Sequence, residues 1–371
     1  MKIGLCMIVR DEAHCIERCL RSVRPIITSW TICDTGSTDE TKAIVARVLH
    51  DLPGELHDDE WVHFAHNRTL AIQRACARRD ADYILVIDAD HEWHGTDLGE
   101  LTADCYMVEH RHQTLRYGIP CLMKADKEWS YKCPIHETVQ GVGTGPTQML
   151  SAKKAWVQVY PEGARSRDPR KFEKDAAVLL KHVAENPDDC RATFYLAQSY
   201  RDAATQAATP EDQDHFRKEA RAWYQRRAEM ENGWWEERWH ACYQYARLAA
   251  LMNLPFEVVM GDYMNAYQAN PSRAEPLYGL AIHARLGGYF GIGTMAARQG
   301  MAIPTPNESH LFVESFIYEW GAQLEFSISA FYVPVFKDEG LKMSQHLLRQ
   351  ELPPHIRQCV EQNVGLYKKA A

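Results

Sequence analysis

The sequence predicts an α/β domain followed by an all-α domain. Between residue 3 and about residue 160, short apolar runs alternate with helix-like segments, which is typical of a sheet built from βαβ units. Beyond residue 168 the apolar residues repeat with a helical period and almost no strand pattern remains. The segment 161–169 is polar and rich in proline and glycine, so we place a boundary there and expect domains at 1–162 and 168–371.

The first domain contains short apolar runs separated by segments with apolar residues three or four positions apart. Pro25 ends the first helix, and Gly36 permits a tight turn after the second strand. Residues 55–62 have no pattern that favours a helix or a strand. The expected helices cover residues 13–23, 42–49 and a segment that begins at Phe64. The expected strands cover residues 3–9, 26–33, 83–87, 105–109, 119–123, 129–139 and 155–160.

The second domain contains a short sequence pattern that occurs twice, called the internal echo below. Asn186-Pro187 is followed by Leu196-Ala197, and Asn270-Pro271 is followed by Leu280-Ala281 at the same offset. Proline at a helix start, with small residues inside the helix at a similar spacing, is typical of stacked helical hairpins. This pattern favours an array of the tetratricopeptide type.

The composition is that of an ordinary globular protein, 46% hydrophobic and 25% charged. A net charge of −8 disfavours a protein that coats nucleic acid or anionic membranes, although a local basic patch stays compatible with it. The 11 cysteines include no Cys-x-x-Cys pair, and their odd number fits free thiols in a reducing cytoplasm. No signal peptide is recognisable, and no apolar run approaches the roughly 18–20 residues that span a bilayer. We therefore expect a soluble, cytoplasmic protein that does not bind a membrane.

Two carboxylates follow the apolar run 83–87. Because side chains alternate along a strand, Asp88 and Asp90 point to the same side and Ala89 points away. Ligands of open α/β sheets bind at the carboxyl ends of the strands. Adjacent carboxylates repel each other unless a cation or a donor lies between them, and oxygen ligands suit Mg²⁺ or Mn²⁺. The pattern predicts a divalent metal that holds a nucleotide diphosphate; the alternative is an Asp-rich turn.

Five motifs occur in order along the first domain. They are Cys6-Met7-Ile8-Val9-Arg10-Asp11-Glu12, Asp34-Thr35-Gly36-Ser37-Thr38-Asp39, Phe64-Ala65-His66-Asn67-Arg68, Asp88-Ala89-Asp90 and His136-Glu137. This series resembles the family 2 glycosyltransferases of the GT-A fold, particularly soluble members with an appended tetratricopeptide-like domain, such as peptide S/O-glycosyltransferases. The resemblance covers about residues 1–160 and extends loosely to the helical half. It implies a metal-dependent, inverting transfer of a sugar from a nucleotide-sugar, most often a UDP-sugar.

The resemblance also implies donor-binding residues. Val9 and Arg10, where the first strand ends, would line the nucleotide pocket. Asp34 would accept hydrogen bonds from uracil or ribose, because a carboxylate suits an imide N–H or a hydroxyl group; the alternative is a turn or a helix cap. Asn67 and Arg68 would reach the donor from the start of the next helix. Arg68 has an alternative as a solvated helix arginine.

The remaining implied residues would bind the metal and carry out the chemistry. Asp88-Ala89-Asp90 would belong to the donor site, with Asp88 on ribose or a metal-held water and Asp90 on Mn²⁺ or Mg²⁺. His136, as a neutral imidazole, is a candidate third ligand. Glu137 is the candidate general base for an acceptor hydroxyl or thiol, while the metal neutralises the leaving diphosphate. The pair could also be an ordinary strand end, and other candidates for the base are Asp88, Glu92 and Glu109.

Two features depart from the family pattern. His91 stands where the family more often has glutamate, and we expect it in a loop. The Gln-x-x-Arg-Trp motif of the membrane synthases has its nearest equivalent at 235–239, in the helical half and with a different first residue. We interpret that segment as aromatic helix packing. The same interpretation is favoured over a sugar- or peptide-binding surface for Trp223, Tyr224, Trp234, Trp235, Trp239 and Tyr243.

The expected acceptor is a macromolecule: a peptide or protein first, a saccharide second and a modified DNA base third. A competing hypothesis is a helical-repeat interaction protein whose sheet domain is inactive. The intact Asp88, Asp90, His136 and Glu137 argue against it. A nucleotidyltransferase is a third hypothesis, but such enzymes usually carry a glycine-rich phosphate loop after the first strand, and 10–13 contains no glycine.

Overall fold

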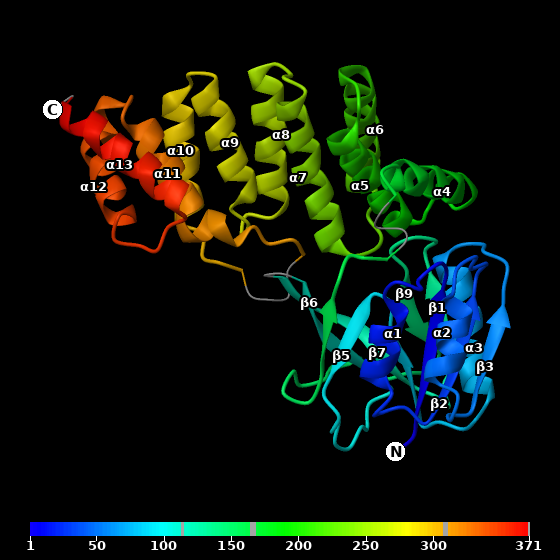
Figure 1. Cartoon of the computed structure of the whole chain (residues 1–371). Helices are drawn as coiled ribbons and strands as arrows, with labels where there is room; N and C mark the ends of the chain where they lie inside the picture. Colours follow the sequence, from blue (N-terminus) through cyan, green and yellow to red (C-terminus); the bar gives the residue numbers. More distant parts are fainter. Residues whose placement is uncertain (113–114, 164–167, 307–310, 370–371) are drawn as a thin grey trace. The chain divides into compact units, whose positions relative to one another are not determined.

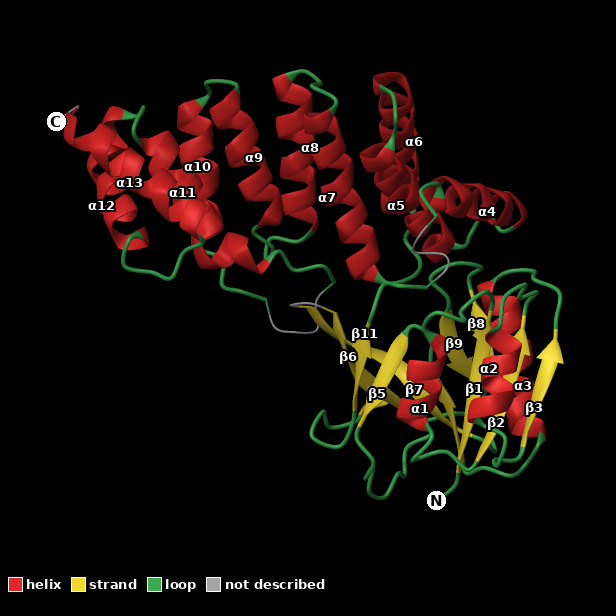
Figure 2. Ribbon diagram, in the orientation of Figure 1, coloured by secondary structure: helices red, strands yellow, loops and turns green. Residues whose placement is uncertain are grey.

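The computed structural model describes residues 1–112, 115–163, 168–306 and 311–369. The chain divides into two compact units, Met1–His182 and Val183–Ala371 (Figure 1). The division falls inside helix α4 (Lys171–Glu185). The first unit combines strands and helices, whereas every regular element described beyond α4 is helical (Figure 2). The predicted fold class is therefore confirmed. The predicted boundary segment includes 164–167, which lie outside the described residues.

A mixed sheet forms the centre of the first unit. Its strands are β1 (Ile3–Val9), β2 (Ser29–Asp34), β3 (Gly54–Asp58), β4 (Tyr83–Val86), β5 (His91–His94), β6 (Cys105–His112), β7 (Leu115–Lys124), β10 (Gln148–Met149) and β11 (Trp156–Val159). Their order is β3-β2-β1-β4-β7-β6-β11-β5, and β10 pairs with β6. Strands β1 to β4 run parallel, and β7 is antiparallel to β4 and β6. A separate hairpin consists of β8 (Trp129–Lys132) and β9 (Thr138–Gly141).

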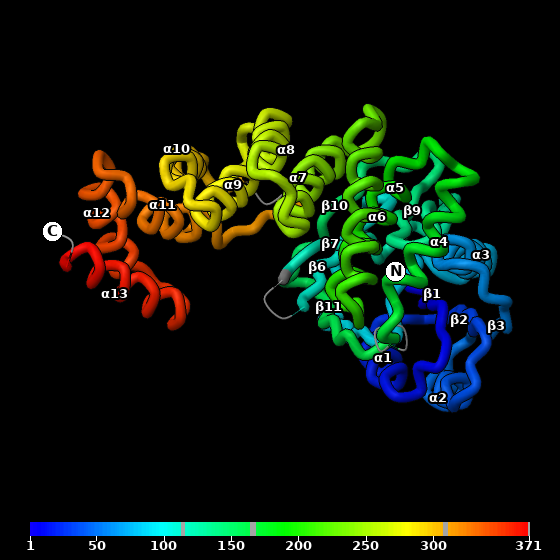
Figure 3. Tube along the Cα trace, turned by 90° about the horizontal axis from the view of Figure 1, so that it is seen from above, coloured from blue at the N-terminus to red at the C-terminus, as the bar shows by residue number. Residues whose placement is uncertain are grey.

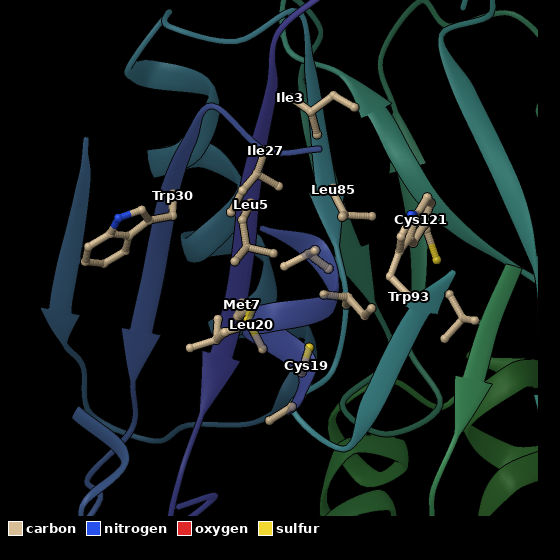
Figure 4. Packing of buried hydrophobic residues seen from close by; sticks show 14 of the residues in the cluster. Ile3, Leu5, Met7, Cys19, Leu20, Ile27, Trp30, Leu85, Trp93 and Cys121 are labelled. Carbon is tan, nitrogen blue, oxygen red and sulfur yellow. The ribbon is translucent and has the colours of Figure 1, made fainter. Parts of the chain in front are cut away.

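Strand β1 is buried on both faces, which explains its continuous apolar run. Leu5 and Met7 belong to one core cluster, together with Leu20 of α1 (Ile16–Val23) (Figure 4). Cys6 belongs to a second cluster, together with Ile72 of α3 (Phe64–Ala77). The remaining helix of this part of the chain is α2 (Thr41–Val48). Alternate residues of β1 therefore belong to different core clusters, one on each face of the sheet.

The strand order reverses at β1. The chain passes from β1 to β2 and β3 on one side, and then places β4 on the other side of β1. Val9 is in register with Asp34, and Cys6 is in register with Val86. The carboxyl ends of β1, β2 and β4 therefore meet at one edge, at a topological switch point of the kind where α/β sheets bind ligands.

The structure differs from the predicted elements at several positions, including the unpredicted strand β10. The predicted strand 129–139 is two strands joined by a turn, because Cys133 and His136 adopt positive φ angles of 69° and 55°. The unassigned segment 55–62 contains most of β3. Strand β5 was not predicted, because only Trp93 of its four residues is buried and polar residues surround it.

The second unit consists of stacked helix pairs (Figure 3). Its helices are α5 (Cys190–Gln206), α6 (Pro210–Glu229), α7 (Trp235–Leu251), α8 (Phe256–Ala269), α9 (Glu275–Leu286), α10 (Phe290–Met301), α11 (Ala322–Ala330), α12 (Lys337–Leu347) and α13 (Pro354–Lys369). A π-helical turn, η2 (Ile317–Gly321), precedes α11, and a 3-10 turn, η3 (Pro334–Phe336), precedes α12. Among the described helices none is long and apolar enough to cross a membrane.

The internal echo marks equivalent positions of two repeats. Asn186-Pro187 precedes α5 and Asn270-Pro271 precedes α9. Leu196-Ala197 and Leu280-Ala281, ten residues further on in each case, are fully or almost fully buried. The echo thus marks buried positions in two helices, α5 and α9, each of which packs against the next helix along the chain.

The cysteines are distributed unequally between the units. All 11 are free thiols, and the seven buried ones lie in the first unit. They are Cys6, Cys15, Cys19, Cys33, Cys105, Cys121 and Cys133. The cysteines of the second unit, Cys190, Cys242 and Cys359, are partly exposed.

A buried ion-pair network joins helices of the second unit. The Arg273 guanidinium lies 2.7 Å from Glu275 and 3.3 Å from Glu236, and all three side chains are at most 2% exposed. Arg273 also donates to the carbonyl oxygen of Leu311, which follows the undescribed residues 307–310. The network ties this returning segment to α7 and α9.

Replacing Arg273 by alanine is expected to destabilise the second unit strongly, because two buried carboxylates lose their partner. The free energy of unfolding should fall by about 3–5 kcal/mol. Lys218→Ala is the control, because its pair with Asp214 is more than half exposed and should contribute at most about 1 kcal/mol. Denaturant unfolding followed by circular dichroism measures both. Equal effects of the two substitutions would contradict the role of the network.

Stability should also decrease in mild acid because of His240. This side chain is 4% exposed among aromatic rings of α5 and α7, and burial holds its pKa well below the usual value. Above pH ~6.5 histidine is neutral in both folded and unfolded chains, so no dependence arises. Below that pH only the unfolded chain gains the proton, and stability falls by up to about 1.4 kcal/mol per pH unit. His240→Gln should flatten this part of the profile between pH 7 and 5; an unchanged slope would refute the assignment.

Candidate active site

One guanidinium joins two of the predicted site residues. Arg68, in the second turn of α3, donates from Nη2 to Asp88 Oδ1 and from Nε to Glu137 Oε1, each at 2.6 Å. The Arg68 and Glu137 side chains are 12% and 15% exposed. The interpretation of Arg68 as a solvated helix arginine is therefore wrong. Its bridge connects α3, the segment after β4 and the segment before β9.

The ion pairs oppose the effects of burial on both charges. Burial disfavours the Arg68 cation, but Asp88 and Glu137 override it and raise its pKa. Burial likewise favours the neutral acid at Asp88, but the Arg68 guanidinium outweighs it and lowers the pKa of Asp88 to about 2. Asp88 is thus a compensated anion.

Asp90 lies in a different electrostatic environment. Burial raises its pKa, His91 lowers it and the Asp88 charge raises it again, with a net upward direction. Its Oδ2 accepts the Gly163 N–H at 3.1 Å, and its Oδ1 lies 3.7 Å from His91 Nε2. Ala89, between the two acids, is buried in the core as the alternation predicted. The uncompensated charge of the motif therefore sits at Asp90.

His91 belongs to this site. It is the first residue of β5 rather than a loop residue, so the loop expectation is wrong. Its ring packs edge-on against His110 with centroids 5.3 Å apart, and its buried Nδ1 has no hydrogen-bond partner in the described part of the chain. His110, whose pKa burial lowers to about 4, was not predicted as a site residue, because nothing near it in the sequence marks its contact with the motif.

Asp34 forms the predicted turn, and its contact with the donor stays a prediction. Its Oδ1 accepts the N–H groups of Gly36 and Ser37 at 2.9 and 2.7 Å, which forms the predicted turn. Its Oδ2 is buried and has no partner among the described residues. A buried acceptor without a donor costs free energy, so this oxygen fits a ligand donor at the switch-point edge. Val9, beside it on β1, is buried, whereas Arg10 is exposed.

Asn67 faces the protein interior. It is fully buried, its Oδ1 accepts the Val62 N–H at 3.0 Å and its Nδ2 donates to the Glu60 carbonyl at 2.9 Å. In this structure its side chain therefore fixes the segment before α3.

The predicted metal ligands do not converge. Among the described residues, one group of three potential ligand side chains has its ligand atoms within 4.8 Å of one another, and it consists of Glu12, His14 and Cys15. Asp88, Asp90 and His136 form no such group here. His136 is exposed, in a left-handed backbone conformation directly before Glu137.

Tyr160 was predicted as the end of a strand and 161–163 as the start of the boundary segment, but residues 160–163 also contact the site. Besides the Gly163 bond to Asp90, Tyr160 donates from its hydroxyl group to Glu92 at 2.9 Å. A Cβ at Gly163 would lie 3.0 Å from Asp90 Oδ2, so a side chain would crowd this carboxylate. The glycine in an otherwise polar segment was the available signal.

Comparisons with known proteins agree with the motif series. Residues 5–105 match the family described as Glycosyl transferase family 2. The match includes Asp34, Arg68 and Asp90, and it ends before His136 and Glu137. A TPR repeat-containing protein of Synechococcus elongatus is 42% identical over 91 residues, which are 24% of this chain and 21% of that protein. The chain thus spans about a fifth of the length of this curated relative.

Solved structures give more distant likenesses. One is TarS 1–349 of S. aureus in complex with UDP-GlcNAc, at 12% identity, 72% coverage of this chain, 89% of that chain and a TM-score of 0.39. Another is YrrB, a TPR protein with an unusual peptide-binding site, at 13% identity, 53% and 84% coverage and a TM-score of 0.38. At TM-scores below 0.5 these likenesses support no inference about function.

Removing the bridging guanidinium should destabilise the first unit. Arg68→Ala leaves Asp88 and Glu137 without their shared donor, and we expect a loss of about 2–3 kcal/mol from charge-assisted hydrogen bonds. Arg68→Lys should recover little of it, because a single ammonium group does not reproduce the forked geometry. Arg116→Ala, at a side chain that is 67% exposed, is the control. If Arg68→Ala unfolds at the same denaturant concentration as the control, the bridge has no structural role.

Proposed function

We propose that the family 2 glycosyltransferase domain in the first unit of this chain is an active, metal-dependent, inverting enzyme that transfers a sugar from a nucleotide-sugar. The proposal is carried by two carboxylates at one edge of the sheet, Asp34 and Asp90, which both lie inside the matched segment. Within the described residues, Asp34 Oδ2 has no hydrogen-bond donor, and Asp90 pairs with no lysine or arginine but only lies 3.7 Å from His91. A nucleotide diphosphate held with a divalent ion would supply both the donor and the cation.

The donor site would comprise Val9, Arg10, Asp34 and the Asp88-Ala89-Asp90 motif. Asp34 Oδ2 would accept from an imide N–H or a ribose hydroxyl, which favours uracil over bases without that N–H. Arg68 would act through Asp88 by holding it in position. Asn67 would contribute through the segment it anchors rather than by direct contact, since both ends of its amide are used.

The residues fit Mn²⁺ or Mg²⁺ chiefly at Asp90. A hard divalent ion commonly takes one or two carboxylates and completes its shell with water and substrate phosphates. Asp90 offers an uncompensated carboxylate, whereas Asp88 Oδ1 already accepts from Arg68. Asp88 and His136 stay predicted ligands. A bound ion would neutralise charge on the leaving diphosphate.

Glu137 is the proposed general base. The proton of an acceptor hydroxyl or thiol would pass to its carboxylate as the acceptor atom bonds to the anomeric carbon. The bond from that carbon to the diphosphate oxygen breaks on the opposite face, and the electron pair leaves with the diphosphate, so the centre is inverted. Because Glu137 Oε1 accepts from Arg68, the proton would go to Oε2.

The proposed acceptor is a peptide or protein, with a saccharide or a modified DNA base as alternatives. Support comes from the tetratricopeptide-like unit and from the exposed Trp234 and Trp235, which are 43% and 52% accessible at the start of α7. The packing interpretation is correct for the neighbouring Tyr224, Trp239 and Tyr243, which are buried, and wrong for the exposed Trp234 and Trp235. An aromatic surface of this kind suits a peptide or a sugar chain.

Nucleotide binding tests the donor site. Thermal unfolding is measured with UDP, GDP, CDP and dTDP, with and without Mn²⁺. At about 100 times the dissociation constant, a ligand of the folded state stabilises it by roughly 2.7 kcal/mol. We expect this shift with UDP and Mn²⁺. Asp90→Ala should remove the part that depends on metal, and Asp126→Ala, an exposed acid, should not.

Asp34→Asn separates the base contact from the metal. The substitution retains an oxygen for the turn and places an amide donor where an acceptor is needed, so UDP should bind at least about tenfold more weakly. Transfer from UDP-sugars to peptide, saccharide and DNA acceptors, followed by mass spectrometry, identifies the acceptor class. If no nucleotide shifts the wild-type protein, the proposal fails and the inactive interaction protein is favoured.

A further inference from the structure

The turn between β1 and α1 carries a carboxylate, an imidazole and a thiol in one place. The ligand atoms of Glu12, His14 and Cys15 lie within 4.8 Å of one another. Cys15 Sγ is 3.2 Å from Glu12 Oε2. We propose that this turn binds Zn²⁺ or a similar borderline-soft divalent metal, at a site separate from the hard-ion site at Asp90.

The backbone of the turn is held in place by hydrogen bonds from the segment after β2. The N–H groups of Asp11, Glu12 and Ala13 donate to Ser37 Oγ, Thr41 Oγ1 and Asp39 Oδ2 at 2.8–3.0 Å. In the other direction, Asp11 Oδ1 accepts the Thr38 N–H. The Glu12 carbonyl oxygen accepts from the N–H groups that begin α1. Ligands on such a fixed turn need little reorganisation to bind a metal.

A second contact orients the imidazole. His14 Nε2 lies 2.7 Å from the carbonyl oxygen of Glu162. Since a carbonyl oxygen only accepts, this bond places the ring proton on Nε2 and leaves the lone pair on Nδ1. Metal-bound histidines usually have this arrangement, with the second nitrogen donating to a carbonyl or carboxylate oxygen. The exposed ring is therefore held in a metal-binding tautomer.

The ligand atoms of this site determine which metals bind it best. Thiolate and imidazole favour zinc and its neighbours, whereas Mg²⁺ and Mn²⁺ prefer oxygen ligands. Three protein ligands leave one position of a tetrahedral ion for water. On binding, the Cys15 thiol releases its proton to solvent and a metal–sulfur bond forms, so affinity rises with pH.

The site lies close to Asp90, the proposed ligand of the hard ion. A Cβ built at Gly163 would be 3.0 Å from Asp90 Oδ2 and 3.6 Å from Glu12 Oε1, so the two acids flank the same segment. Arg18 of α1 also pairs with Glu162 at 2.8 Å. A metal on Glu12, His14 and Cys15 would add to the bonds that hold 160–163 beside Asp90.

Cobalt binding tests the proposal without any activity measurement. Chelator-treated full-length protein is titrated with Co²⁺, and the near-ultraviolet band of a cobalt–thiolate bond is recorded. We expect one equivalent to give the band, with release of one proton to a pH indicator. Zn²⁺ should abolish the band by competition.

Variants assign the ligands. Cys15→Ser should lose the band, and His14→Ala, at an exposed position that tolerates the change, should weaken Co²⁺ binding at least about tenfold. Cys359→Ser, at a partly exposed thiol of the second unit, should keep the band. Asp90→Ala should also keep it, which separates this site from the proposed donor site. A band that survives Cys15→Ser, unchanged binding by His14→Ala or no band in the wild type would overturn the proposal.

Discussion

The Arg68 guanidinium donates hydrogen bonds to both Asp88 and Glu137 and thereby determines the charge balance at this edge of the sheet. Without it, Asp88, Asp90 and Glu137 would place three uncompensated carboxylates at an edge proposed to bind a diphosphate. With it, Asp88 is a compensated anion, and the raised pKa at Asp90 marks the carboxylate that a cation would relieve. Two acids separated by a single residue thus acquire different properties because, in the described part of the chain, an arginine pairs with Asp88 and none pairs with Asp90.

Much of the first unit could be predicted from local pattern. Strands β1 and β4 are continuous apolar runs because both of their faces are covered, and helix 64–77 follows from apolar spacing. The edge where Asp34 and Asp88 meet follows from the parallel topology. Local pattern failed at β5, where only Trp93 is buried and the alternation is too short to see.

The contacts that decide the site were not predictable from the sequence. Arg68 meets Glu137 across 69 residues, and Gly163 meets Asp90 across 73. Gly163 marks a special backbone position in the sequence, but nothing in the sequence identifies the partner of Gly163 or of Arg68. Each contact depends on how the hairpin β8–β9 and the segment after β11 return to the edge. The sequence likewise did not show that Asp34 uses Oδ1 for the turn, so that the proposed ligand contact would use Oδ2. In the second unit the repeat echo was visible, but the buried Arg273 network was not, since charged residues in a helical pattern usually indicate a solvated face.

Because seven thiols of the first unit are buried, their chemical modification measures how often that unit opens. A maleimide or iodoacetamide reagent modifies Cys6 or Cys121 only when the sheet core has separated, whereas Cys190, Cys242 and Cys359 are partly accessible in the folded second unit. The order of alkylation therefore distinguishes local opening from global unfolding without any added label. The same distribution has a cost during refolding. Unfolded chains present seven additional reactive sulfurs from one unit, so oxidation traps that unit in non-native disulfides unless a reductant is present.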